Sequence, residues 1–337
     1  MTRKYSKRVQ QWRQQKIKQE RKERADKHEQ QVDSIVHQQS LGEIEIGTVV
    51  AQFGKQLLIE DGGGEIHECV SRRSVDKLVC GDSVQWQNSS QGNGVVIARN
   101  PRHSELGRPN YQGKVRVIAA NIDYILIVVA PEPKLDEDLI NRYLVAATLT
   151  DIPALLVVNK TDLLSKKEMS ELEIQLHVYQ ELDIPVLFIS CAEKSGLAQL
   201  SPYFKNSLSI VVGQSGVGKS SLIKTLLPER DIRIGKISVR SRLGKHTTTA
   251  AQLYRIDRGG IVDSPGIREF GLEHINAEAI ASGFVEFTKF IGKCKFNDCS
   301  HQHEPGCAIK AAALEQQGIS AQRYQSYLRI LKSLSKP

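Results

Sequence analysis

The residues Leu208-Ser-Ile-Val-Val212 run directly into Gly213-Gln-Ser-Gly-Val-Gly218-Lys219-Ser220, a β-branched run followed by a Gly-x4-Gly-Lys-Ser loop. Residues 221–227 then have the pattern of a helix, and Pro228 ends it. Glycines let backbone N–H groups turn inward around phosphate oxygens, where the helix N-terminus adds positive potential. The alternative is a glycine turn before an ordinary helix, which the lysine, the serine and both flanking elements disfavour. The stretch therefore predicts a P-loop that binds a nucleoside triphosphate.

Two side chains of this loop have predicted roles in phosphate chemistry. Lys219 is expected to reach the β- and γ-phosphates, and the Ser220 hydroxyl is expected to bind Mg²⁺, which would accompany the nucleotide. The predicted nucleotide-binding residues are Gly213, Gln214, Ser215, Gly216, Val217, Gly218, Lys219, Ser220 and Ser221.

Buried strands alternate with helices on the N-terminal side of the P-loop. Residues 122–130 and 153–158 are nearly unbroken apolar runs, as in strands buried on both faces, and residues 186–189 form a shorter one. Helical patterns at residues 135–148 and 166–182 lie between these runs. The alternation predicts a doubly wound α/β domain.

The residues Asn159-Lys160-Thr161-Asp162 follow the second of these strands. A carboxylate at Asp162 can accept hydrogen bonds from guanine N1–H and from its exocyclic amine, whereas adenine offers neither donor at those positions. An unpaired buried acceptor is how such a site rejects the wrong base. We expect Asn159 to contact the base edge and to hold the loop, and the stem of Lys160 to lie along the ring.

A second short motif, Ser190-Cys191-Ala192, ends the third strand and is expected to offer a backbone N–H to guanine O6. This motif is weak evidence when it stands alone. Together with the Asn-Lys-x-Asp sequence and the P-loop, it predicts that the nucleotide is GTP or GDP.

Two polar segments after the P-loop have the composition of GTPase switches. Asp263-Ser-Pro-Gly266 fits an Asp-x-x-Gly element in which Asp263 holds Mg²⁺ through water and the Gly266 amide senses the γ-phosphate. One residue of Thr247-Thr248-Thr249, with Thr247 and Thr248 as the Mg²⁺ candidates, is expected to close over the metal. These threonines could equally form only a turn.

Many GTPases orient the attacking water with a glutamine directly after Asp-x-x-Gly, but Ile267 stands at that position here. The polar candidate for this task is His246, although a lone histidine is more often structural. The predicted catalytic set is therefore His246, Lys219, Asp263 and Gly266. The missing glutamine also predicts slow hydrolysis that needs a partner to complete the site.

The motifs occur in the order base loop, Ser-Cys-Ala, P-loop, threonine switch and Asp-x-x-Gly, whereas the usual GTPase order begins with the P-loop. This order predicts a circular permutation. It places the second switch directly before a C-terminal region that is rich in cysteine.

That region contains Cys294-x4-Cys299-x-His301-x5-Cys307, whose three thiolates and one imidazole could form a closed, structural Cys₃His zinc site. His303 is a rival ligand, and a set of free cysteines is a further alternative. The remaining cysteines, Cys69, Cys80 and Cys191, are scattered, so a reduced compartment is expected.

The net charge of +8 is concentrated in the N-terminal tail, where residues 1–27 hold eleven Lys or Arg against three acidic residues. Such a tail predicts a nucleic-acid-binding arm, with a disordered solubility tail as the alternative. Five short candidate strands follow and are separated by glycines, which predicts an OB-type barrel. Another small β-barrel fits nearly as well. The candidate strands are residues 47–53, 56–59, 66–70, 82–86 and 94–98.

The chain has neither the run of about 18 apolar residues that a membrane helix needs nor the apolar core of a secretory signal, so a cytoplasmic protein is expected. We expect a multidomain α/β architecture with four segments. These are a basic, disordered tail at residues 1–42, an OB-fold-like barrel at 43–110, a circularly permuted P-loop GTPase domain at 111–275 and a mainly helical zinc-binding domain at 276–337. In the last domain, helical patterns at residues 277–291 and 320–334 surround the cysteine motif.

Taken together, these motifs resemble the ribosome small subunit-dependent GTPase A family, circularly permuted bacterial GTPases of small-subunit maturation. The resemblance extends over the whole chain and includes Gly244-Lys-His246-Thr247-Thr248-Thr249 and the cysteine motif. It departs from the family at Ser264, where threonine is expected. It favours His301 over His303 as the metal ligand.

The resemblance implies binding to the small (30S) ribosomal subunit and its 16S rRNA, and ribosome-stimulated hydrolysis of GTP to GDP and phosphate. We expect a monomer that leaves the subunit after hydrolysis. The competing hypothesis is a non-catalytic RNA-binding assembly protein with a merely structural nucleotide site. The intact Lys219, Ser220 and Asp263 favour the enzyme.

Overall fold

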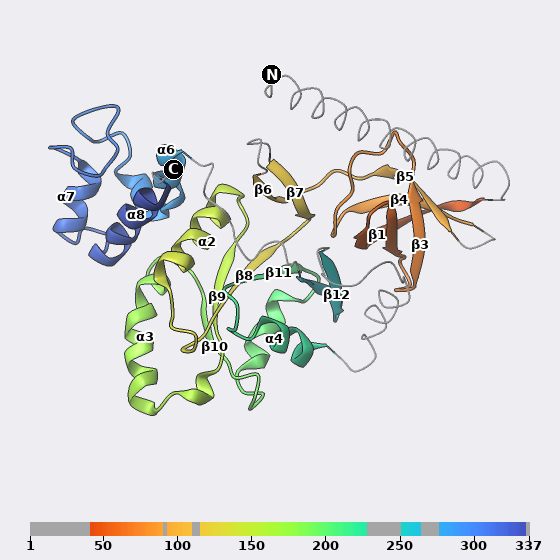
Figure 1. Ribbon diagram of the computed structural model, residues 1–337, viewed down its shortest axis with the longest axis horizontal. Helices are drawn as coiled ribbons and strands as arrows, with labels where there is room; N and C mark the ends of the chain where they lie inside the picture. Colours follow the sequence, from red (N-terminus) through yellow and green to blue (C-terminus); the bar gives the residue numbers. More distant parts are fainter. Residues whose placement is uncertain (1–40, 90–92, 110–114, 228–250, 264–275, 335–337) are drawn as a thin grey trace, which may run out of the picture. The chain divides into compact units, whose positions relative to one another are not determined.

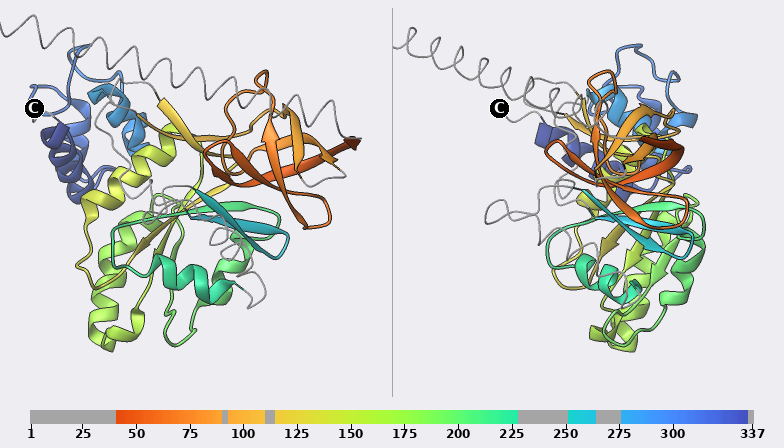
Figure 2. Two further views of the ribbon diagram at one scale, coloured as in Figure 1. Left: turned by 45° about the vertical axis from the view of Figure 1, so that its right-hand side comes forward. Right: turned by 90° about the vertical axis from the view of Figure 1, so that its right-hand side faces the viewer.

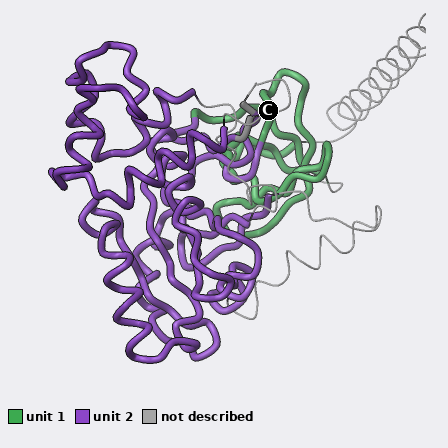
Figure 3. The backbone as a smooth tube through the Cα atoms, turned by 60° about the vertical axis from the view of Figure 1, so that its left-hand side comes forward, with its two compact units in different colours: residues 1–78, 82–101 green, residues 79–81, 102–337 purple. Residues whose placement is uncertain are grey.

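The computed structural model describes residues 41–89, 93–109, 115–227, 251–263 and 276–334 (Figure 1). The chain forms two compact units (Figure 3). The first contains the described residues up to 78 together with residues 82–101, and the second contains residues 79–81 and the described residues from 102 onward. Residues 1–40 of the predicted basic tail and the threonine switch lie outside the described residues, and residues 41 and 42 belong to the first barrel strand.

The first unit is a closed five-stranded barrel, which confirms all five candidate strands. Each strand pairs with two neighbours, in the ring order β1-β2-β3-β5-β4 and back to β1, and β3 and β5 run parallel. Trp86 is fully buried in the barrel core among Val49, Leu57, Ile59 and Val96. The strands are β1 (Leu41–Phe53), β2 (Gln56–Glu60), β3 (Ile66–Ser71), β4 (Ser83–Ser89) and β5 (Gly94–Arg99).

The second unit is built on a mainly parallel sheet with the strand order β10-β9-β8-β11-β13-β12. All adjacent pairs are parallel except β13 and β12. The strands are β8 (Tyr124–Val129), β9 (Ala154–Val158), β10 (Val186–Phe188), β11 (Leu208–Val212), β12 (Gln252–Ile256) and β13 (Gly259–Asp263). This arrangement confirms the predicted α/β domain.

Helices connect these strands, as predicted. They are α2 (Glu137–Leu149), α3 (Lys166–Gln180) and α4 (Lys219–Leu226), with 3₁₀ segments η1 (Thr161–Leu163) and η2 (Leu197–Tyr203). Leu222 and Ile223 of α4 pack in one core with Leu126 and Val128 of β8. Because parallel strands end at one edge of a sheet, the loops after β8, β9 and β11 meet there, beside the end of β13.

An antiparallel hairpin, β6 (Glu105–Pro109) and β7 (Val115–Ala120), precedes the sheet and was not among the predicted elements. The first strand of the α/β domain follows it. Within the described residues, no helix is both long and apolar enough to cross a membrane.

The C-terminal region is helical, as predicted, but its first element differs from the prediction. The helical pattern predicted over residues 277–291 is divided between two elements, α6 (Ala277–Gly283) and the 3₁₀ segment η4 (Val285–Lys289). A Cβ at Gly283 would lie 2.5 Å from Cγ1 of Val145, so the two helices approach too closely there for any side chain. The chain turns at Phe284, whose ring stacks on that of Phe287.

Two further helices complete this region, α7 (Ala308–Leu314), which was not predicted, and α8 (Ala321–Leu334), which was. Val145 and Ala146 of α2 share one core with the buried residues of α6, η4, α7 and α8. Figure 2 shows the blue C-terminal helices beside α2. Helix α2 thus connects two strands of the sheet and also contributes to the core of the C-terminal region.

Candidate functional site

The P-loop joins β11 to α4 at the edge where the parallel strands end. Its backbone adopts positive φ angles at Gly213 (137°), Gly216 (87°) and Gly218 (95°). A Cβ would lie 2.2 Å from the Val128 oxygen at Gly213 and 2.2 Å from Asn159 Nδ2 at Gly218. Glycine is therefore required at both positions by close packing as well as by conformation.

The lysine of this loop lies across the loop itself. Lys219 Nζ donates to the carbonyl oxygens of Gly213 at 2.7 Å and Gln214 at 2.5 Å. A phosphate bound in the loop would offer competing oxygen acceptors to the same ammonium group. The hydroxyl groups of Ser220 and Ser221 are exposed at the start of α4, where an Mg²⁺–phosphate group could reach them.

Asn159 joins three of the predicted nucleotide-binding loops. Its side chain is 1% exposed, its Nδ2 donates to Val217 O at 2.9 Å, and its Oδ1 accepts from the backbone N–H of Cys191 at 3.2 Å. The residue was predicted to contact the base and to hold the loop. In this structure both ends of its amide hold loops.

Asp162 is exposed in the 3₁₀ turn η1, and its Oδ1 accepts a hydrogen bond from the Ser190 hydroxyl. Ser190 Oγ in turn accepts from the backbone N–H of Glu193 at 3.1 Å. Thr161 anchors the same turn by donating from its hydroxyl to Ile189 O at 3.0 Å. The sequence motif suggested only a backbone contribution from residues 190–192, so the orienting role of the Ser190 side chain was missed.

A further loop takes part that the sequence analysis did not single out. The β8–α2 loop (residues 130–136) accepts a hydrogen bond at Glu132 O from Lys160 Nζ, at 2.8 Å. Gln214 Nε2 donates to Pro133 O at 3.3 Å and to Lys134 O at 3.2 Å. Its position directly after a central parallel strand was the signal that could have identified it.

Asp263 is the last residue of β13, the strand that neighbours β11. This places its half-buried side chain at the same edge of the sheet as the P-loop. The other predicted switch and catalytic residues, His246, Thr247, Thr248, Thr249 and Gly266, lie outside the described residues.

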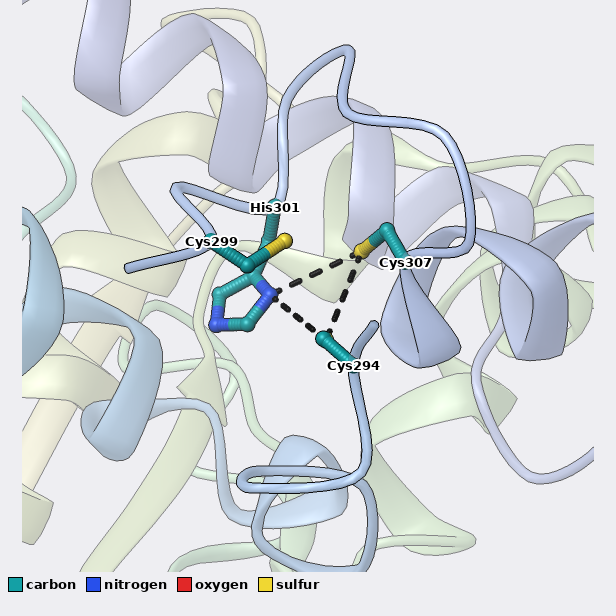
Figure 4. A group of neighbouring side chains, drawn as sticks. All are labelled: Cys294, Cys299, His301 and Cys307. Carbon is teal, nitrogen blue, oxygen red and sulfur yellow. Dashed lines mark hydrogen bonds between the residues drawn. The ribbon is translucent and has the colours of Figure 1, made fainter. Parts of the chain in front are cut away.

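The four residues of the predicted metal site converge in the C-terminal region (Figure 4). The Sγ atoms of Cys294, Cys299 and Cys307 and a ring nitrogen of His301 all lie within 4.8 Å of one another. Nδ1 of His301 lies 3.5 Å from Cys294 Sγ and 3.6 Å from Cys307 Sγ, and those two sulfurs are 3.9 Å apart. The rival candidate, His303, is exposed and outside this group.

These separations fit a tetrahedral metal ion. Metal–sulfur bonds of about 2.3 Å and a metal–nitrogen bond of about 2.0 Å would separate two sulfurs by roughly 3.8 Å, and sulfur from nitrogen by roughly 3.5 Å. Burial raises the pKa of Cys299 to about 12 and also raises that of Cys307. The geometry therefore fits a metal ion, whose binding would release the protons of these thiols.

The model of the RsgA GTPase family matches residues 99–273, which is more than half of the chain. The chain belongs to the RsgA GTPase family. Its members are GTPases, and the permuted order of the motifs in this chain agrees with that assignment.

Two relatives of the RsgA GTPase family, from Ectopseudomonas mendocina and Hahella chejuensis, are both named small ribosomal subunit biogenesis GTPase RsgA. The first is 45% identical over 332 residues, covering 97% of this chain and 96% of the relative. The second is 44% identical over 332 residues, covering 97% of this chain and 95% of the relative.

Solved structures support the fold. The crystal structure of YjeQ from Thermotoga maritima matches with a TM-score of 0.71 and 28% identity, covering 88% of this chain and all of that one (100%). The structure of YloQ, described as a circularly permuted GTPase, matches with a TM-score of 0.69 and 22% identity, covering 88% of this chain and 97% of that one. The circular permutation predicted from the motif order is confirmed.

In this member of the RsgA GTPase family, hydrogen bonds hold the metal-binding loop in place. The Glu304 carboxylate accepts from the backbone N–H groups of Ser300, Gln302 and His303 at 2.8, 3.1 and 3.1 Å. Burial alone would raise the pKa of Glu304, but these and the Ser300 hydroxyl bond outweigh it and lower the pKa to about 2. The loop is therefore closed by a carboxylate that stays ionised.

Backbone N–H groups also orient two of the cysteine sulfurs. Cys307 caps α7 and accepts from the Lys310 N–H at 3.4 Å, and Cys294 Sγ accepts from the Ala308 N–H at 3.4 Å. From α8, the Tyr324 hydroxyl donates to His301 O at 2.8 Å and the Tyr327 hydroxyl donates to Ser300 O at 2.9 Å. Helix α8 thus fixes the segment that presents the histidine.

Proposed function

We propose that this protein is a GTP-hydrolysing assembly factor that binds the small (30S) ribosomal subunit late in its maturation and leaves after hydrolysis of GTP to GDP and phosphate. The observation that carries the proposal is the Asn159 side chain, which joins the base loop, the Cys191 segment and the P-loop into one nucleotide site. The names of the two whole-length relatives support the ribosomal partner.

The guanine base is recognised by the carboxylate of Asp162, which Ser190 orients. Lys219 binds the β- and γ-phosphates once it leaves the Gly213 and Gln214 carbonyls. The Asp162 carboxylate and the backbone N–H of Ala192 together select guanine over adenine, while the Cys191 N–H holds Asn159.

Mg²⁺ bound with the nucleotide would neutralise charge on the transferring phosphoryl group. Ser220 would hold it directly and Asp263 through water, and Thr247 or Thr248 would complete the set. The Gly266 amide senses the γ-phosphate, and His246 orients the attacking water. These assignments rest on the sequence motifs. His246 is assigned to the water because Ile267 stands at the position where many GTPases have the glutamine that orients it.

The cluster of Cys294, Cys299, His301 and Cys307 holds one structural Zn²⁺. Its geometry and its sulfur-rich donor set suit zinc, and all four positions of a tetrahedron are taken by protein, so no position is open for catalysis. The ion stabilises the C-terminal region and does not take part in hydrolysis.

The basic tail of residues 1–27 and the barrel bind 16S rRNA, and the protein acts as a cytoplasmic monomer. The excess of eight positive charges in the tail supports an electrostatic contact with RNA phosphates. Binding of this kind weakens steeply with salt.

Phosphate release under multiple-turnover conditions, with and without 30S subunits, tests the proposal. We expect slow release alone and a strong stimulation by the subunit, which His246→Ala loses while it retains nucleotide-dependent 30S binding. A non-hydrolysable GTP analogue should raise 30S affinity well above that with GDP. Binding to 30S without any turnover in either condition would favour the non-catalytic assembly protein.

A further inference from the structure

The β8–α2 loop is bound to both halves of the nucleotide site. Its carbonyl oxygens at Glu132, Pro133 and Lys134 accept hydrogen bonds from the side chains of Lys160 and Gln214. One donor belongs to the base loop and the other to the P-loop. The loop then continues without interruption into helix α2, whose N-terminal turn it positions.

That first turn of α2 is joined to helix α8 through Asp138. The carboxylate accepts from Nε and Nη2 of Arg329 at 2.7 and 2.8 Å, and from the Ser326 hydroxyl at 2.6 Å. A bidentate guanidinium–carboxylate pair fixes direction as well as distance. Burial alone would raise the pKa of Asp138, but these hydrogen bonds lower it overall.

Behind Asp138, the contact between α2 and α8 is polar and buried. Asn141 is 0% exposed, and its Nδ2 donates to Ser326 Oγ at 2.7 Å while its Oδ1 accepts from Arg323. Arg323 also pairs with Glu286 of η4, at 2.7 and 3.0 Å. An apolar interface could slip, but sliding α8 along α2 would leave several of these buried polar groups unpaired. The two helices therefore move together.

The opposite side of α8 holds the metal-binding loop. The hydroxyl groups of Tyr324 and Tyr327 donate to the backbone carbonyls of His301 and Ser300. An unbroken series of hydrogen bonds and helices thus runs from the P-loop to the segment that carries the histidine ligand, entirely within the described residues of the second unit.

We propose that Asp138 is a positioning residue through which the nucleotide site and the metal-binding loop are energetically coupled. Nucleotide binding gives Lys219 phosphate acceptors in place of the Gly213 and Gln214 carbonyls, and lays Lys160 along the base. The second change removes the Lys160 donor from Glu132 O. The first frees the backbone carbonyl of Gln214, the residue whose side chain donates to Pro133 O and Lys134 O. Helix α2 transmits the difference through Asp138 to α8, and α8 transmits it to the metal-binding loop. This rests on the proposed nucleotide and zinc sites.

The coupling is measurable at the metal. At equilibrium, nucleotide must change the affinity for zinc by the same factor by which zinc changes the affinity for nucleotide, and tighter zinc binding is observed as slower zinc release. The experiment uses the full-length, zinc-loaded protein and records transfer of Zn²⁺ to a chromophoric chelator, with and without saturating GDP. We expect GDP to slow zinc release about five-fold. This corresponds to the lower end of coupling between linked sites when the association rate of zinc is unchanged. Thermal unfolding is recorded in parallel for each variant.

Asp138→Asn should release zinc at a rate that GDP no longer changes, although GDP still binds. Arg329→Gln removes the other member of the same ion pair, and this side chain is the more exposed of the two. It should also abolish the effect of GDP on zinc release, and agreement between the two variants argues against a folding defect in Asp138→Asn. The matched control is Glu171→Gln, which breaks the exposed Lys167–Glu171 pair on α3 and should keep the five-fold effect.

Equal slowing by GDP in the wild type and in both variants would overturn the proposal. So would zinc release in the wild type that GDP does not affect while GDP binding is measurable. Failure of the wild type to bind GDP at all would instead overturn the proposed nucleotide site, and the two failures are therefore distinguishable.

Discussion

The side-chain nitrogen of Asn159 donates a 2.9 Å hydrogen bond to the carbonyl oxygen of Val217, inside the P-loop. One buried amide therefore sets the distance between the loop that selects the base and the loop that binds the phosphates. In a permuted chain these loops lie far from their usual order, but the strand order β9-β8-β11 still brings them together.

Asn159→Ala should weaken GDP binding by at least about ten-fold, because Val217 O and the Cys191 N–H lose a buried partner and each loss costs about 1–3 kcal/mol. Titration with a fluorescent GDP analogue measures it. Asn276→Ala, which removes the N-cap of α6, is the control and should lower stability without changing affinity. Wild-type affinity in Asn159→Ala would show that the amide does not organise the site.

Asp162→Asn should shift the preference from guanosine to xanthosine nucleotides, because an amide suits the altered edge of xanthine. Ser190→Ala should still prefer guanine, but by a smaller factor, because it removes only the hydroxyl that orients the Asp162 carboxylate. Competition between GDP and XDP measures both effects. Unaltered GDP selectivity in Asp162→Asn would remove this carboxylate from base recognition.

The parts of the fold that could be predicted from sequence are those set by local pattern. Strand β11 at 208–212 coincides with the predicted run because a buried parallel strand is continuously apolar and glycine follows it at once. The close approach of Gly283, at the end of α6, to Val145 of a distant helix could not be predicted. Local helix propensity in 277–291 gives no sign of that contact.

The site shows the same division. Asn159, Asp162 and Lys219 could be predicted as site residues from the spacing of their motifs, because their chemistry requires fixed neighbours in the sequence. The side-chain role of Ser190 and the use of the β8–α2 loop depend on how strands lie beside one another. Arg323 illustrates the limit most clearly, since a charged residue on an amphipathic helix is expected at the surface, yet it is 2% exposed beside Glu286.

Asp61 should contribute to the acid sensitivity of the barrel unit. The 2.7 Å contact with His67, aided by the Gly63 and Glu65 N–H groups, holds the pKa of Asp61 below its ordinary value of 3.8. Because the folded pKa is the lower one, the stabilisation is complete above the unfolded pKa and is lost as the pH falls through the folded pKa. The relevant window therefore lies below about pH 4.

Urea unfolding followed by Trp86 fluorescence, in a Trp12→Phe background, measures this contribution between pH 5 and pH 3, two values chosen around the ordinary carboxyl pKa of about 4. Asp61→Asn should lose less free energy of unfolding over that interval than the unchanged chain. Parallel pH profiles for the two proteins would show that the Asp61–His67 contact does not contribute.

The metal site offers a test with a built-in control, because two histidines lie between the last two cysteines. His301→Ala should reduce zinc content to near zero, since the remaining thiolates cannot complete the tetrahedron, and should unfold the C-terminal region. His303→Ala should retain full zinc, because its ring is exposed and only its backbone N–H takes part, through Glu304. Alanine at Cys294, Cys299 or Cys307 should likewise reduce the zinc content to near zero.

Mass-spectrometric metal analysis, with circular dichroism of each variant, measures the outcome. Full zinc in His301→Ala together with loss in His303→Ala would assign the imidazole ligand to His303, against the 3.5 and 3.6 Å approaches of His301 Nδ1 to the two sulfurs.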